Sequence, residues 1–148
     1  MVTIIPGYMY SIFAALIVGT IIVTSCAVAM TNLKNEATNQ QLSNVDEYVA
    51  TQSLTLINQV NENGQNATQV LNPPTSIGNQ EYWISLANDS SNAWVESGFG
   101  SFAAQSEPEI YIPADVAASG AYVSGWGNAI LQCYIQNQTV TLILTESG

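Results

Sequence analysis

Residues 10–30 read YSIFAALIVGTIIVTSCAVAM, a stretch without a charged residue or a proline. As an α-helix, about 21 residues extend roughly 30 Å, which matches the hydrocarbon core of a bilayer. The apolar core of a secretory signal peptide is shorter, roughly 7 to 15 residues, and it follows a basic segment. No Lys or Arg precedes this stretch. We therefore expect a permanent helix that is apolar on all sides and buried on all sides in the working protein.

The composition of the chain excludes several classes of function. Its 148 residues carry a formal net charge of -10, with Lys34 as the single basic residue and no histidine. Nucleic acids and anionic membrane surfaces are bound by clustered Lys and Arg, so neither is an expected partner. Without histidine the chain cannot build a Ser-His-Asp or Cys-His site. We therefore expect no enzymatic activity and no cofactor, and the amide- and hydroxyl-rich body suggests an extracellular protein.

After Met30 the helical pattern becomes amphipathic. No proline lies between Pro6 and Pro73, so residues 8 to about 63 can form one helix, roughly 80 Å long. Apolar residues recur in this second part at spacings of three, four and seven, namely Leu42, Val45, Val49, Leu56 and Val60. Polar residues are expected on the other side, namely Asn35, Glu36, Asn39, Asp46, Asn58 and Asn61. This pattern predicts one buried stripe that docks on a domain or on other helices.

The rest of the chain predicts a linker and a β-rich head. Residues 64–80 contain Pro73 and Pro74 and are expected to form the linker. From Glu81 the apolar period becomes two, which predicts short strands at 82–86, 93–95, 109–112, 120–123, 129–136 and 139–145. The last two are expected to form a hairpin around Asn137 and Gln138. The expected class is α+β, with an apolar helix at 1–30, its amphipathic continuation at 31–63, the linker, and a small antiparallel sheet or sandwich at 81–148.

Few residues in the head suggest a chemical site. Three sequons for N-glycosylation fall in expected loops, with acceptors Asn66, Asn88 and Asn137, although a chain rich in Asn and Thr produces such triplets by chance as well. Glu107 and Glu109 would point the same way in an extended strand. Calcium needs six to eight oxygen ligands, however, and no such cluster is visible, so no metal site is expected.

Tryptophans and cysteines have two interpretations each. Trp83, Trp94 and Trp126 could form an adhesive or sugar-binding surface, but in a small sheet domain they are more often core residues. Cys26 and Cys133 lie in separate parts of the chain, and a disulfide requires Cα atoms within about 7 Å. We expect both to be buried free thiols.

The apolar run from Tyr8 to Met30, the stripe from Leu42 to Val60 and the sequon-bearing β head together resemble the archaeal type IV pilins and archaellins. The resemblance covers nearly the whole chain but rests on architecture, without a short sequence motif. Precursors in that family carry a basic residue and Gly just before the cleavage point, whereas here Pro6 precedes Gly7 and no basic residue lies upstream.

The resemblance implies a homo-oligomer of many copies. The subunit would lie in a membrane before assembly, and afterwards it would belong to an extracellular filament on the cell surface that serves adhesion or motility. Glycans or cell-surface receptors are the further partners it implies. Apolar helices would form the filament core and the heads would coat the outside. Core residues on that basis are Phe13, Leu16, Ile17, Gly19, Ile21, Ile22 and Val28. Gly19 and Ala15 also form a small-xxx-small pair suited to close helix approach.

Two alternatives remain open from the sequence. One is a single-pass anchored surface protein whose head binds an envelope partner, and the other is a viral structural protein. The stripe from Leu42 to Val60 is the feature expected to discriminate, because a lone anchor needs only the first apolar residues of the helix.

Overall fold

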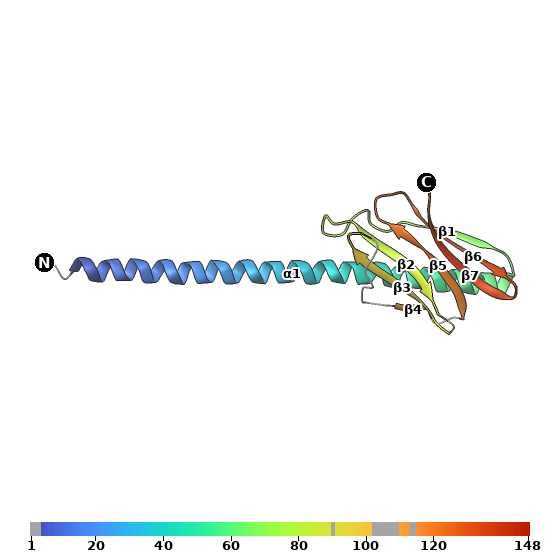
Figure 1. Ribbon diagram of the computed structural model, residues 1–148, viewed down its shortest axis with the longest axis horizontal. Coiled ribbons are helices and arrows are strands. Elements are labelled where there is room, and N and C mark those ends of the chain that lie inside the picture. The colour runs from blue at the N-terminus through green and yellow to red at the C-terminus, as the bar shows by residue number, and fades with distance from the viewer. Residues whose placement is uncertain (1–3, 90, 102–109, 113–114) are drawn as a thin grey trace. The chain divides into compact units, whose positions relative to one another are not determined.

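The computed structural model describes residues 4–89, 91–101, 110–112 and 115–148. It consists of helix α1 (Ile4–Asn63) and seven strands, which confirms the α+β class (Figure 1). α1 begins before the expected residue 8 and has Pro6 in its first turn. The N–H groups of the first turn have no partner within the helix, so the N–H that proline lacks costs no hydrogen bond there. It ends at Asn63 as predicted. Gly64 terminates it with a φ of 64° and donates its N–H to the Val60 carbonyl at 2.8 Å.

The chain divides into two compact units, Met1–Ala37 and Thr38–Gly148. This boundary lies inside α1, seven residues beyond the expected end of the apolar part at residue 30. The second unit therefore contains the last turns of the helix together with all seven strands. We call this second unit the head.

The strands form one sheet in the order β1-β6-β7-β5-β2-β3-β4. Their bounds are β1 (Ala67–Leu71), β2 (Tyr82–Asn88), β3 (Ala93–Phe99), β4 (Ile110–Ile112), β5 (Val116–Val123), β6 (Ala129–Gln136) and β7 (Thr139–Glu146). Strand β1 lies within the expected linker and pairs antiparallel with β6, so the linker prediction was wrong over these five residues. The apolar alternation of β1 is weak because β1 lies at the edge of the sheet, where it pairs with one strand and only Leu71 is fully buried.

The sheet is mostly antiparallel, with one parallel pair that the sequence analysis missed. Strands β5 and β6 follow each other in sequence, but β7 lies between them and runs parallel to β5. Gly120 faces Leu144 in this pair and has a φ of 104°. A Cβ atom at residue 120 would lie 2.1 Å from the Leu144 carbonyl oxygen. Glycine is therefore required where the two strands meet.

The predicted hairpin between β6 and β7 is confirmed. Gln136 pairs with Thr139, which leaves Asn137 and Gln138 as a two-residue loop. Both loop residues have positive φ, 51° and 66°, as a type I′ turn requires. Asn tolerates this conformation, and its position at the first central residue is the local reason for the hairpin.

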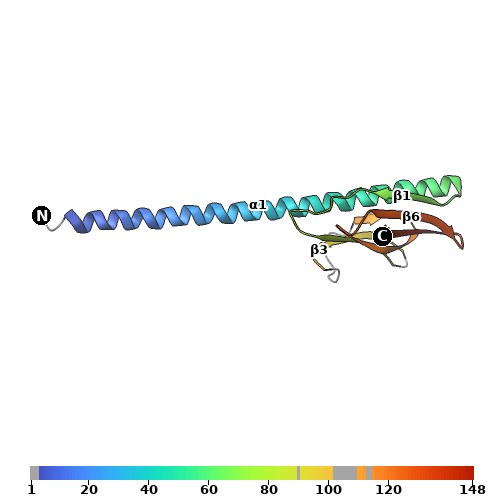
Figure 2. The same ribbon diagram turned by 90° about the horizontal axis from the view of Figure 1, so that it is seen from above.

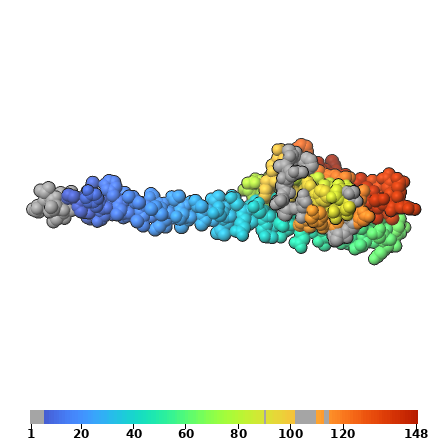
Figure 3. Space-filling view, turned by 60° about the horizontal axis from the view of Figure 1, so that its bottom comes forward, coloured from blue at the N-terminus to red at the C-terminus, as the bar shows by residue number. Residues whose placement is uncertain are grey.

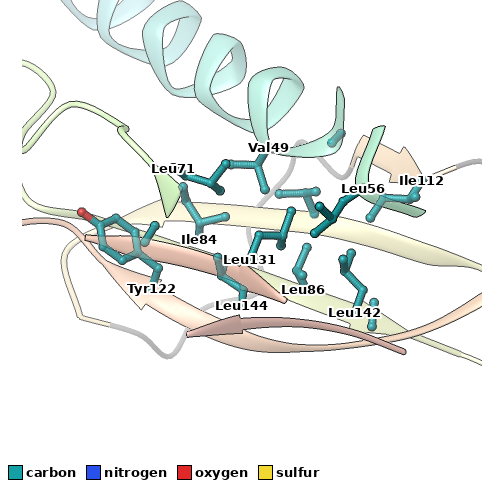
Figure 4. Packing of buried hydrophobic residues seen from close by; sticks show 14 of the residues in the cluster. Val49, Leu56, Leu71, Ile84, Leu86, Ile112, Tyr122, Leu131, Leu142 and Leu144 are labelled. Carbon is teal, nitrogen blue, oxygen red and sulfur yellow. The ribbon is translucent and has the colours of Figure 1, made fainter. Parts of the chain in front are cut away.

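The head has two layers, the last part of α1 and the sheet (Figure 2). Every residue of the predicted stripe is buried, from 8% exposed at Val45 to 0% at Val60. Figure 4 shows Val49 and Leu56 pointing from the helix toward the sheet, where Ile84, Leu131 and Leu144 belong to the same core. The docking partner of the stripe is thus the chain's own sheet.

One polar residue was placed wrongly. Asp46 was expected on the solvent side of the helix, but it is 0% exposed. It stands four residues from both Leu42 and Ala50, which are buried too, so its spacing belongs to the stripe. The chemical type of the side chain, rather than its helical phase, had suggested exposure.

Candidate functional site: an exposed apolar helical surface

The first unit carries a large apolar surface on α1, in the part of the helix that Figure 3 draws in blue. Fourteen large apolar side chains between residues 8 and 33 are exposed over 43% to 76% of their surface. They are Tyr8, Met9, Tyr10, Ile12, Phe13, Leu16, Ile17, Val18, Ile21, Ile22, Val23, Val28, Met30 and Leu33. We call this set the apolar surface. Six of the seven residues assigned to a filament core by resemblance belong to it, and the seventh, Gly19, lies among them.

The apolar surface surrounds the helix. Leu16, Ile17 and Val18 are consecutive, so their side chains leave the axis about 100° apart and face three different directions. Full burial of such a side chain contributes about 1.5–3 kcal/mol, so the exposed parts of fourteen represent on the order of 15 kcal/mol. That energy is as large as the whole stability of a typical domain. The segment therefore requires an apolar environment on every side.

Three hydroxyl side chains that lie among these residues, those of Thr20, Thr24 and Ser25, are already hydrogen-bonded within the helix. Thr20 Oγ1 donates to the Ile17 carbonyl at 2.8 Å, Thr24 Oγ1 to the Thr20 carbonyl at 2.7 Å, and Ser25 Oγ to the Ile21 carbonyl at 2.8 Å. Such back-bonding removes the cost of transferring a hydroxyl out of water. These polar residues are therefore compatible with the same apolar environment as their neighbours.

One side of the apolar surface is hollowed into a shallow groove. Its lining residues are Ala15, Leu16, Gly19, Thr20, Val23 and Thr24. A Cβ atom at Gly19 would meet nothing within 4 Å, so the backbone there is open to a neighbour. Small residues four apart allow the backbones of two helices to approach closely. Ala15 and Gly19 thus make the groove the place on this surface where a second helix can approach most closely.

Length and composition also make this helix long and apolar enough to cross a membrane, and the most apolar part of Pro6–Asn63 is not buried within the chain. The apolar surface from Tyr8 to Leu33 extends about 38 Å along the axis. A hydrocarbon core of about 30 Å would cover most of it. Insertion into a bilayer could therefore satisfy this segment.

The three candidate glycosylation sites are all on the surface of the head. Asn66 lies between α1 and β1, Asn88 is the last residue of β2, and Asn137 opens the β6–β7 turn. All three asparagines are exposed. Ser90, which completes the second sequon, lies outside the described residues. Exposure is a condition that a glycosylation acceptor must meet, and each of the three meets it.

The three tryptophans have different environments. Trp83 is 3% exposed, and a Cβ atom at Gly98 would lie 2.8 Å from its indole, so Gly98 makes the space for the ring. Trp94 is half-buried and donates its indole N–H to Glu96 Oε1 at 2.6 Å. Trp126 is 70% exposed. The core prediction is thus confirmed for Trp83 and wrong for Trp126, which follows a glycine with positive φ in the loop after β5.

No metal-binding set is formed by the described side chains, where no three His, Cys, Asp or Glu residues come together. Glu107 and Glu109 lie outside the described residues. Cys133 is buried and free, and burial raises the pKa of its thiol. Cys26 is also free but exposed on α1, so the prediction that both thiols are buried was wrong for this single chain. Cys26 lies among apolar residues on α1, but no described residue of the first unit packs over its side chain.

Comparisons with known proteins found no matching family model, no matching curated protein and no matching solved structure. A function for this chain has to come from its own residues. The apolar surface is the feature with the largest unmet physical requirement, and the groove at Gly19 is its most specific part.

Proposed function

We propose that this chain is the structural subunit of an extracellular helical filament. The α1 helices of many copies pack into the filament core through the apolar surface, and the heads face outward for surface adhesion or motility. Before assembly the same surface holds the subunit in a membrane. Contacts between one copy and the next are heterologous, and such contacts produce open filaments when the rotation does not close a ring.

One observation carries the proposal: the apolar surface covers every side of α1 between Tyr8 and Leu33. A helix that docks on one partner needs a single apolar face, whereas one in the centre of a bundle is apolar all round. The open backbone at Gly19 also supports the filament. A small residue lets a neighbouring helix approach closely and pack, whereas contact with fluid lipid does not need a small residue. The length of the surface, about 38 Å, also exceeds a hydrocarbon core of about 30 Å.

A single-pass membrane anchor is the second candidate, since α1 is long and apolar enough to cross a bilayer. The stripe from Leu42 to Val60 does not separate the two candidates, because the sheet of the same chain buries it. In the anchor, lipid surrounds the apolar surface and the head binds an envelope partner. A viral structural protein would bury the apolar surface either against other copies of the chain or in a membrane.

Neither candidate involves catalysis. A nucleophile would lack a histidine base anywhere in the chain, and the thiol of Cys133 is buried in the core. We propose instead that the exposed, amide-rich surface of the head carries the function outside the cell. Glycans at Asn66, Asn88 or Asn137 and receptors on other cells are its proposed partners, and nucleic acid is not among them.

The proposal is tested by placing a charge in the apolar surface. Ile17→Asp or Ile21→Asp puts a carboxylate where an apolar neighbour packs, and burial of an unpaired charge costs several kcal/mol. We expect negative-stain electron micrographs of the sheared cell-surface fraction to show filaments for the wild type and none for either variant. Mass spectrometry of the fraction identifies the chain and its mature N-terminus.

A matched control places the same charge on the head. Asn58 is an exposed residue of α1 within the second unit, and Asn58→Asp changes its charge at nearly constant size. Filaments should persist in this variant. The head should remain folded in all variants, as measured by near-UV circular dichroism of the detergent-extracted chain. Normal filaments from Ile17→Asp would refute the proposal.

A further inference from the structure

Asp46 is a buried acid at the contact between α1 and the sheet. Its side chain is 0% exposed, and Ser97 of β3, also 0% exposed, donates its hydroxyl to Asp46 Oδ2 at 2.5 Å. The second oxygen, Oδ1, has no hydrogen-bond partner in the described part of the chain. One hydrogen bond thus joins the helix to β3, and one buried carboxyl oxygen is left without compensation.

No positive charge is available to pair with this carboxylate in the head. The head, residues 38–148, contains no Lys, Arg or His. On the side of the sheet that faces α1, the titratable residues are Tyr82 of β2, Tyr122 of β5, Cys133 of β6 and, at the exposed end of β7, Glu146. The described residues of β1, β3 and β4 add none on that side, and Glu47, next to Asp46 on α1, is exposed. Every one of these groups is neutral or negative.

A buried carboxylate without a counter-charge is unstable, and the group responds by holding its proton. Burial raises the pKa of Asp46 from 3.8 to about 7, although the hydrogen bond from Ser97 lowers it. The ionised form of Asp46 in turn contributes to the raised pKa of the Tyr82 hydroxyl, after burial and Tyr122. Asp46 and the strands under it therefore form one low-dielectric region.

We propose that Asp46 is a proton-dependent latch between α1 and the sheet: as a neutral acid it holds the helix on β3, and on ionisation it loosens that contact. The head is accordingly most tightly closed in acidic surroundings. Its low content of charged groups is consistent with such surroundings, because its remaining polar surface does not depend on ionisation.

The sign of the pH dependence follows from linkage. The folded state binds the Asp46 proton more tightly than the unfolded state, because the pKa is raised on folding. The contribution of this group is therefore fully present below about pH 4 and is lost as the pH rises to about 7. Within that window the unfolding equilibrium constant increases up to about tenfold per pH unit from Asp46 alone.

The test is denaturant unfolding of the full chain in detergent micelles between pH 4 and pH 7, followed by near-UV circular dichroism and by tryptophan fluorescence. We expect the wild type to lose stability across this range. Asp46→Asn keeps the size of the side chain and the Ser97 hydrogen bond but does not titrate. Its unfolding constant should therefore lack the increase of up to about tenfold per pH unit that Asp46 gives the wild type. Glu47→Gln, the matched control on the exposed neighbour, should reproduce the wild-type slope.

Parallel profiles for the wild type and Asp46→Asn would overturn the proposal. A second measurement works even if that variant does not fold. Carbon-13 NMR of the Asp side-chain carboxyls in the wild-type chain should show one group that titrates near neutral pH, and Ser97→Ala should move its midpoint upward by removing the donor. A spectrum in which every Asp titrates below pH 5 would also overturn the proposal.

Discussion

At Gly120 the backbones of β5 and β7 come so close that no side chain fits between them. The chain solves this problem with a residue that has no Cβ atom and that also tolerates the φ of 104°. Gly127 is a second such position, where a Cβ atom would lie 2.3 Å from the Ser147 carbonyl oxygen. Both glycines hold the C-terminal strand in the middle of the sheet.

We therefore predict that Gly120→Ala destabilises the head by about 3 kcal/mol or more, because the added methyl group collides with backbone that cannot move away. The measurement is the free energy of unfolding of the full chain in detergent. Gly100→Ala is the matched control: its φ of 81° is also positive, but nothing lies within 4 Å of the added atom. It should lose only about 1 kcal/mol. Equal losses in the two variants would contradict the account of the β5–β7 contact.

At the scale of elements, local patterns were enough to predict α1 and the β6–β7 hairpin. The helix end near residue 63 was expected from the linker that contains Pro73 and Pro74, and Asn137 and Gln138 marked the turn; the structure adds Gly64 as the residue that terminates the helix. Local sequence could not show that β7 inserts beside β5, because parallel pairing depends on contacts distant in the chain. Asp46 was misplaced for a different reason, since its helical phase belongs to the buried stripe and its chemical type alone had suggested exposure.

The apolar surface was predictable from the sequence, because an uninterrupted run of apolar residues places apolar side chains on every side of a helix. Its burial in an assembly stays a prediction. Its groove was predictable in part. Ala15 and Gly19 were recognised by their spacing, whereas Thr20 and Thr24, whose hydroxyls are bonded back to the helix, were not recognised as residues that line the same groove. The sequence pattern does not show whether lipid or other helices surround the apolar part of α1, because both environments favour the same apolar residues.

Gly19→Leu tests whether a helix packs into that groove. The new side chain meets nothing within 4 Å of its first atom in the single chain, so the variant should fold and insert into membranes like the wild type. In the filament it would push a neighbouring helix away, and we expect a loss of at least tenfold in the filament yield, measured by quantitative immunoblotting of the sheared fraction. Asn58→Leu adds the same side chain at an exposed position of α1 in the head, outside the apolar surface, and should assemble normally. Unchanged yield from Gly19→Leu would show that no helix occupies the groove.

At the scale of the whole molecule, the two units of the chain differ in the polarity of their surfaces. The first unit carries the apolar surface, whereas the head has its own core and a net negative charge without a basic residue. The head buries its stripe against its own sheet. The exposed apolar side chains that remain belong to the apolar surface, and the two proposed functions, filament subunit and membrane anchor, differ in what surrounds that surface.

The most direct measurement of that difference is photo-crosslinking in intact cells from a photoreactive amino acid placed at Ile17. The filament account predicts a ladder of adducts at multiples of the mass of the chain, which disappears when the chain is first dissolved as monomers in detergent. A single band at the monomer mass, carrying lipid adducts alone, in a fraction that includes the sheared cell surface would contradict it.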